Sequence, residues 1–279
     1  MRIQISNYFL IVIIKVKVTT VDTIKEVFKY REMIFSMVRR DLRGKYQRSV
    51  FGFLWTFLNP LFQLMVYTIM FTVLFPNNMI EKFYLFLFIG LVPWLFFSIC
   101  LSAGAGAVLR QESLVKKIYF PRVVLPISFV TSEFINMLLT FVVVFLAIMV
   151  SGLGIDFRVI VALPFIMLIE YIFALGITML FSAITVYVRD LEHILSIVAM
   201  AWMYLTPILY DIDTIPEAFR KYIYINPMTS IIMSYKKVLY YKEFPLVSTL
   251  ILALVEAIIV FFIGACTFIK LQKRFVEEL

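Results

Sequence analysis

The feature that most constrains this chain is an abrupt change from cationic to apolar sequence between residues 37 and 75. Just before the change lie five basic residues: Arg39, Arg40, Arg43, Lys45 and Arg48. From Phe53 to Phe75 no residue is charged. A bilayer core about 30 Å thick requires roughly 20 apolar residues in a helix, and a charge at its centre is costly. The apolar part is therefore predicted to span a membrane, and the cationic part to lie in water at its surface.

Composition extends this prediction to the whole chain. Hydrophobic residues make up 63%, aromatic residues 17%, and the mean hydropathy is +0.98, values outside the range of a soluble domain of 279 residues. The net charge of +8 does not predict nucleic-acid binding, because the charges lie in loops between apolar runs. Cys100 and Cys266 lie within apolar runs without metal or redox spacing, so no metal site is predicted. The chain is predicted to be an all-α, polytopic membrane protein.

Six transmembrane helices are expected, joined by short polar loops. Their approximate ranges are 53–75, 83–107, 124–150, 159–188, 194–209 and 246–269. Together they form one predicted domain, residues 49–279. Between the fifth and sixth spans, residues 211–245 are too polar to cross and are predicted to form short re-entrant helices. Asn226 is expected to cap the second of these, with Pro227 in its first turn.

An amphipathic helix is predicted before the first span, within residues 21–48. Apolar residues recur there at intervals of three and four, Thr23 and Glu26 can form a capping box, and Gly44 lies near the end. We expect this helix to lie in the membrane interface. Residues 1–20 hold an apolar run too short to span and are expected to be a poorly ordered extension.

The distribution of basic residues predicts which side of the membrane holds the chain ends. Six spans put both ends on one side, which would carry 19 of the 26 Lys and Arg residues, against 7 on the other. Because cytoplasmic loops are enriched in Lys and Arg, both ends are predicted to be cytoplasmic.

Two loops on that side carry candidate functional residues. Residues 109–123 are predicted to hold a short helix followed by an exposed aromatic pair, Tyr119 and Phe120, which would suit protein docking. An ordinary basic loop is the competing interpretation. Arg189 and Asp190 are expected to pair with each other between the fourth and fifth spans.

Five stretches, taken in order, resemble one family. They are RRDLRGKYQRSVFGFLWTFLNPL (39–61), LVKKIYFPRVVLP (114–126), VYVRDLEHIL (186–195), TPILYD (206–211) and INPMTSIIMSYKKVLY (225–240). With six spans they resemble the membrane subunits of type 2 ABC exporters that move bacterial surface polysaccharides such as O-antigen, teichoic acid and capsule. Lys236 stands where arginine would be expected in that family.

The resemblance implies a function and partners. It implies a homodimer in the bacterial cytoplasmic membrane, served by two phosphate-loop ATPase subunits that bind ATP and Mg and exporting a lipid-linked polysaccharide. The chain itself has no GxxxxGK[ST] sequence, so it is expected to bind no cofactor and not to be an enzyme.

The resemblance also assigns roles to residues. Coupling to the ATPase would use Glu112, Leu114, Lys116, Lys117, Tyr119, Phe120 and Arg122, with Arg39, Arg40 and Arg43 on the interface helix beside them. An outer gate within 211–245 would include Asn226, Pro227 and Lys236. The candidate substrate path consists of Trp55, Tyr67, Trp202, Tyr204 and Tyr210, whose rings could face sugars, although rings near a membrane surface are also bilayer anchors.

Other functional classes remain open. A proton-coupled transporter or channel would use Glu133, Glu170 and Glu256, which lie within predicted spans. It would depend on the proton gradient rather than on ATP. A glycan-modifying membrane enzyme would be active without a partner, but the sequence offers no catalytic set for one. An exporter of lipid or drugs is a further alternative within the family.

Overall fold

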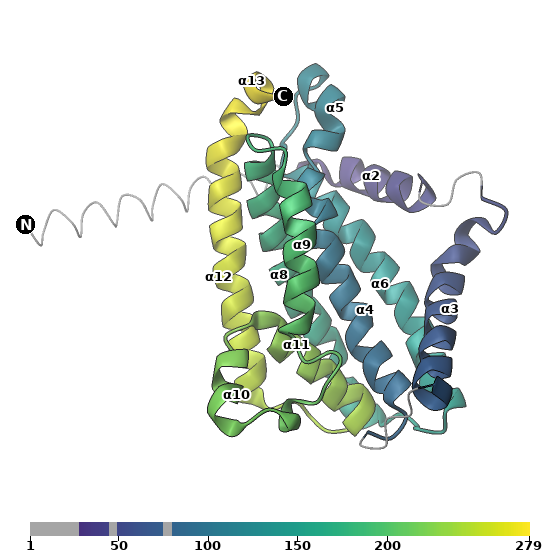
Figure 1. Ribbon diagram of the computed structural model, residues 1–279. Coiled ribbons are helices and arrows are strands. Elements are labelled where there is room, and N and C mark those ends of the chain that lie inside the picture. Colours follow the sequence, from purple (N-terminus) through teal and green to yellow (C-terminus); the bar gives the residue numbers. More distant parts are fainter. Residues whose placement is uncertain (1–27, 45–48, 75–79) are drawn as a thin grey trace, which may run out of the picture.

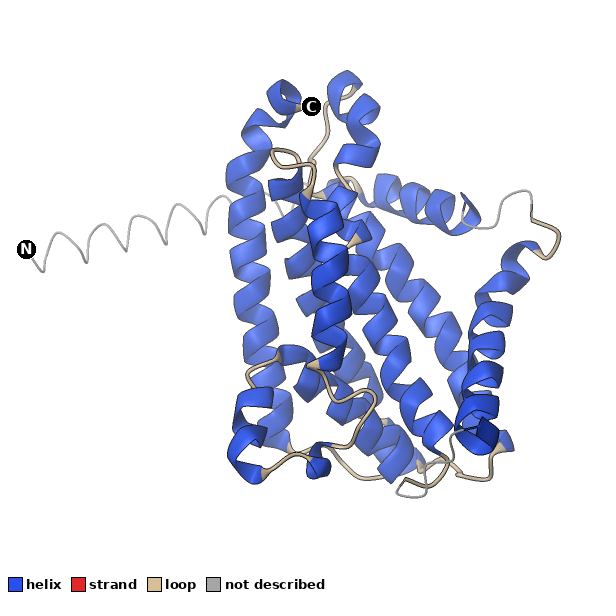
Figure 2. Ribbon diagram, in the orientation of Figure 1, coloured by secondary structure: helices blue, strands red, loops and turns tan. Residues whose placement is uncertain are grey.

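The computed structural model describes residues 28–44, 49–74 and 80–279, and these residues form helices and loops without strands (Figures 1 and 2). The predicted extension 1–20 and the capping box of Thr23 and Glu26 lie outside the described residues. The all-α, polytopic prediction is confirmed.

Among the described residues, five helical stretches are long and apolar enough to cross a membrane: Gly52–Leu74, Phe83–Gly106, Val124–Val150, Phe157–Thr185 and Val247–Glu278. Within them lie the principal helices α3 (Trp55–Ile69), α4 (Phe83–Leu101), α6 (Val124–Val150), α8 (Leu163–Thr185) and α12 (Val247–Leu271), together with the short α7 (Phe157–Ile160) and α13 (Phe275–Glu278).

The predicted fifth span is shorter than expected. It forms α9 (Leu191–Tyr204), whose 14 residues are apolar but extend only about 21 Å at the usual helical rise. The helix begins three residues before the predicted start, and Pro207 follows its end. Five spans are thus long enough by themselves, and the number six stays a prediction.

The core centres on α4. Every side chain from Leu85 to Ile89 is at most 2% exposed, and α4 contacts α6, α8, α9 and α11. Pro93 lies inside the helix without ending it, and the α-helix gives way only later to the 3-10 segment Ala103–Gly106.

The closest helix pairing joins α8 to α12, side by side in Figure 1. Gly176 and Gly264 meet there: a Cβ on Gly264 would lie 2.1 Å from the carbonyl oxygen of Gly176, and one on Gly176 would lie 2.5 Å from the Cα of Phe261. Only residues without side chains allow this approach in a membrane, where helices associate through close packing.

The two ends of the bundle differ. At one end lie α2 (Arg31–Gly44), α5 (Glu112–Lys117), α13 and the chain's C-terminus; at the other lie α10 (Glu217–Ile223) and α11 (Pro227–Lys236) (Figure 1). The helix α2 packs on α6 through the buried Met37 and Val38. The helix α2 lies within residues 21–48, where an amphipathic helix is expected, and its position at the membrane interface stays a prediction.

Candidate functional site

The helix α5 presents a cationic and aromatic surface outside the bundle. Val115 is buried and anchors the helix, whereas Lys116 and Lys117 are exposed. The Lys116 Nζ lies 2.7 Å from Glu112 Oε1, one helical turn away. This hydrogen bond and the ammonium charge lower the pKa of Glu112. Tyr119 is 90% exposed, the expected property of a docking residue.

Phe120 corrects the predicted aromatic pair. Its side chain is only 5% exposed and belongs to the core, so Tyr119 projects alone. The backbone is extended after α5, which sends consecutive side chains to opposite sides. Arg122 donates to the carbonyl of Gln272 at 2.8 Å, and Leu114 packs partly buried against the core. The loop is therefore fixed to the end of α12.

Arg189 and Asp190 do not pair with each other among the described residues. Both are exposed, and Arg189 instead contributes to lowering the pKa of Glu112, which places this loop near α5. An ion pair between the two loops joins Arg110 to Glu192 at 3.1 Å. This partnership was not predicted, because the residues are 82 positions apart in the sequence.

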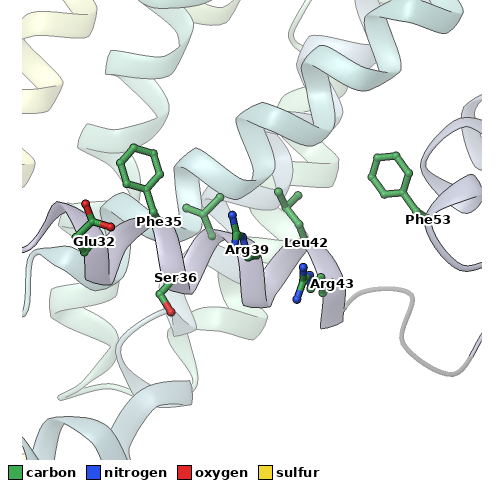
Figure 3. Close-up of a pocket in the computed structure, with 8 residues that line it drawn as sticks. Glu32, Phe35, Ser36, Arg39, Leu42, Arg43 and Phe53 are labelled. Carbon is green, nitrogen blue, oxygen red and sulfur yellow. The ribbon is translucent and has the colours of Figure 1, made fainter.

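The interface helix carries its three predicted arginines on the exposed side. Arg39, Arg40 and Arg43 are all exposed, and Arg40 donates to its neighbour Asp41 and to Gln111 of the loop before α5. Arg39 and Arg43 also line a cavity of about 770 Å³. In Figure 3, Phe53 lies across this cavity from the Leu42 and Arg43 end of α2.

The five aromatic residues proposed for the substrate path have different contacts and exposures in the described residues. Trp202 packs edge-on against Phe97, and its Nε1 donates to Asn226 Oδ1 at 2.9 Å. Trp55 donates a hydrogen bond to Ser49, just before α3, and Tyr67 accepts one from Gln63 within α3. Tyr204 is 61% exposed, and Tyr210 donates to its carbonyl. Trp202 thus has a structural contact, while Tyr204 is free to face lipid or another molecule.

Asn226 connects α9 to α11. Besides accepting from Trp202, its Oδ1 accepts from the backbone N–H of Met228, so the predicted cap beside Pro227 is confirmed. Its Nδ2 donates to Thr206 Oγ1 at 2.9 Å. The side chain therefore holds the end of one helix against the start of the next.

Lys236 is fully buried at the end of α11. Its Nζ donates to the carbonyls of Pro207 and Ile208, at 2.6 and 3.1 Å, and lies 3.4 Å from the ring centroid of Phe86. Gly90 makes room for the stem, since a Cβ there would lie 3.0 Å from Lys236 Cε. Two carbonyl oxygens and an aromatic face thus surround the ammonium group.

The three intramembrane carboxylates lie in different surroundings. Glu170 is fully buried on α8 and accepts from Tyr235 of α11 at 2.6 Å. Glu133 is 5% exposed on α6, and Glu256 is half-buried on α12. The described residues contain no group of three His, Cys, Asp or Glu side chains arranged to hold a metal ion.

Sequence analysis missed a groove between α3, α4 and α6. It has a volume of about 280 Å³, and its polar lining comes from two helices: Thr56, Asn59 and Gln63 on α3, and Glu133, Asn136 and Thr140 on α6. The signal was present in the sequence, because both sets are spaced i, i+3, i+7 and so share one helical face.

Comparison with known proteins gives a consistent result. The family model described as ABC-2 type transporter matches residues 32–240. The O-antigen export system permease protein RfbA of Myxococcus xanthus is 33% identical over 258 residues, 92% of this chain and 98% of that protein. RfbA of Klebsiella pneumoniae is 33% identical over 89% of this chain and 95% of its own length. The polysialic acid transport protein KpsM of Escherichia coli is 23% identical over 69% of this chain and 75% of its own length. The chain therefore belongs to the ABC-2 type transporter family of membrane proteins.

Proposed function

We propose that this chain is the permease subunit of an ATP-driven exporter that moves a lipid-linked polysaccharide across the bacterial cytoplasmic membrane. Relatives named for O-antigen export match almost the full length of the chain, and this is the observation that carries the proposal. The chain itself is not an enzyme in this account.

The partner is a phosphate-loop ATPase that docks on α5. The exposed Lys116, Lys117 and Tyr119 offer two cations and one aromatic ring to a groove with acidic and apolar lining. Val115 and the contact of Arg122 with Gln272 fix α5 to the bundle, so a displacement of the partner moves the spans. ATP and Mg bind to the partner.

Two copies of the chain, with two ATPase subunits, form the complete exporter. The spans α3 and α12 leave long rows of apolar side chains exposed, available to lipid or to a second copy. The path opens between copies, and exposed rings such as Tyr204 contact sugars along it. With both ends of the chain cytoplasmic, α5 faces the ATPase, while α10 and α11 form an outer gate in which α10 is the exposed part and α11 the packed part.

The test is copurification from native cells in mild detergent. Wild-type chain is expected to bring down a phosphate-loop ATPase in equal amount, and the triple variant Lys116→Ala, Lys117→Ala, Tyr119→Ala is expected to lose most of it. The control variant Phe157→Ala, Arg158→Ala removes an exposed ring and a cation at the opposite end and should retain the ATPase. Repeated recovery of wild-type chain without an ATPase would refute the proposal.

A further inference from the structure

The groove between α3 and α6 is lined by two facing polar stripes. Thr56, Asn59 and Gln63 share one face of α3, and Glu133, Asn136 and Thr140 share one face of α6. Polar side chains within a membrane commonly join helices by hydrogen bonds. Here Gln63 Nε2 bonds instead to Tyr67 of its own helix, and Thr140 Oγ1 to the carbonyl of Asn136. These two side chains therefore do not join α3 to α6.

Two polar atoms of the groove have unused bonding capacity. Thr56 is 4% exposed, and its Oγ1 has no hydrogen-bond partner among the described residues. The buried Nδ2 of Asn136 likewise has none within the part of the chain that the structure describes. Because buried polar groups in proteins are nearly always paired, these two atoms point to a bound group that supplies the missing partners.

The chemistry of the lining selects an uncharged, hydroxyl-rich group. None of the described residues that line the groove is Lys or Arg, which excludes the usual partners of phosphate. The amides and hydroxyls can both donate to and accept from sugar hydroxyls, and the one carboxylate can accept from them. The volume of about 280 Å³ is near the lower limit of small-molecule sites, which suits one sugar residue rather than a chain.

A second cavity lies next to the groove, toward the end of the bundle that holds α2. It has a volume of about 350 Å³, shares Glu133 with the groove and extends to Arg40 of α2 and Arg110. A ligand with an anionic part could thus leave that part beside the arginines while its sugar enters the groove.

We propose that the groove of Thr56, Gln63, Glu133, Asn136 and Thr140 binds a single uncharged sugar residue of a lipid-linked substrate within one protomer. This site is separate from a path between copies. The proposal rests on the proposed function for the origin of its ligand, but sugar binding can be measured without export.

The first test measures thiol labelling of the purified permease and ATPase complex in lipid nanodiscs. Asn136→Cys is placed in a Cys266→Ser background, because Cys100 is buried whereas Cys266 is exposed. The probes are dodecyl maltoside and a dodecyl ether of octaethylene glycol, which share the alkyl chain and differ in the sugar. Maltoside is expected to slow maleimide labelling about three- to tenfold, the effect of roughly one hydrogen bond. Leu138→Cys, exposed on the same helix, is the control and should label equally with both.

Three outcomes would overturn the sugar site: no labelling at Asn136→Cys, equal slowing by both amphiphiles, or no slowing by either. A second test in cells uses Gln63→Leu with Asn136→Leu, which should lower surface glycan about tenfold or more while the ATPase still copurifies. Unchanged export by this assembled variant also contradicts the site. If deletion of the wild-type chain leaves surface glycan unchanged, the proposed function fails, and the labelling result still decides whether the groove binds sugar.

Discussion

The two helix pairs α8 with α12 and α3 with α6 use opposite means of association. Glycines at the first contact bring backbones together, so that no atom could be added at Gly264 without displacing Gly176. At the second, polar side chains line a groove and leave Thr56 Oγ1 and Asn136 Nδ2 without partners among the described residues. α3 also exposes most of its apolar surface.

The difference divides the protomer into a packed half, around α8, α11 and α12, and an adaptable half, around α3 and α6. In the packed half, the buried Lys236 and the partly buried Asn226 have hydrogen-bond partners, whereas Glu170 Oε1, Thr229 Oγ1, Ser230 Oγ and Glu256 Oε2 have none among the described residues. In the other half, the two unpartnered atoms belong to Thr56 and Asn136, which line a groove that a ligand can enter. Function is therefore expected to concentrate around α3 and α6, and stability around α8, α11 and α12.

The largest expected effect comes from adding volume to the packed half. Gly264→Ala places a methyl group 2.1 Å from the Gly176 oxygen and must separate α8 from α12, with an expected loss of about 3 kcal/mol or more, at the upper end for overpacking. Thermal unfolding of the purified chain measures the loss. Gly44→Ala, at a glycine with no neighbouring atom within 4 Å, should leave stability unchanged.

The distinction between the two helix pairs fails if Asn136→Leu lowers stability more than Gly264→Ala does. Asn136→Leu in the groove is expected to fold with nearly wild-type stability, since it fills space and removes a polar atom that has no partner among the described residues. Equal losses for Gly264→Ala and Asn136→Leu would show that both halves are packed alike.

A second prediction concerns the buried lysine. Lys236→Met keeps the stem beside Gly90 but leaves the carbonyls of Pro207 and Ile208 without a donor, at a cost of about 1–3 kcal/mol. Lys237→Met is the matched control, because its exposed pair with Glu243 contributes at most about 1 kcal/mol. Thermal unfolding that is equally affected by both substitutions would contradict a structural role of Lys236.

The positions of most spans were predictable from the sequence, because hydropathy locates spans. The predicted range 124–150 coincides with α6, and the cap formed by Asn226 follows from local chemistry. Which spans pair is not a local property: Gly176 and Gly264 are ordinary helix residues until α8 meets α12. The shortness of α9 was also missed, because an apolar run continues past the residues that form helix.

A third prediction distinguishes two aromatic residues. Trp202→Phe keeps the ring packing on Phe97 and loses one hydrogen bond to Asn226, with an expected cost of about 1 kcal/mol and unchanged export. Tyr204→Ala should leave stability unchanged and reduce export if the exposed ring contacts sugar. Surface glycan and thermal unfolding, measured for both variants, decide which residue is structural and which contacts sugar. Export lost in Trp202→Phe but not in Tyr204→Ala would reverse it.

The candidate coupling residues illustrate what sequence can locate and what it cannot. The basic loop with Tyr119 follows from residue type and position, but the burial of Phe120 depends on the direction of the backbone after α5. The pair of Arg110 with Glu192 depends on which loops meet. The identity of functional segments was thus predictable, and the contacts between them were not.

The smallest expected effect is the pH dependence of α5. Lys116 lowers the pKa of Glu112, so any stabilisation from the ionised carboxylate is present above the ordinary Glu pKa of about 4.3 and is lost as the pH falls through the lowered value. ATPase copurification should therefore be equal at pH 8 and pH 6, in the wild type and in Glu112→Gln. A decline between these values that disappears in Glu112→Gln would show that Glu112 titrates there.

The most direct test of the central claim is deletion of this chain from its native cells, followed by quantification of surface glycan and of lipid-linked glycan inside the cell. We expect surface glycan to disappear, the lipid-linked precursor to accumulate inside, and both to be restored by wild-type chain only when the partner ATPase hydrolyses ATP. Unchanged surface glycan in the deletion strain, or restoration with a hydrolysis-defective ATPase, would contradict the account.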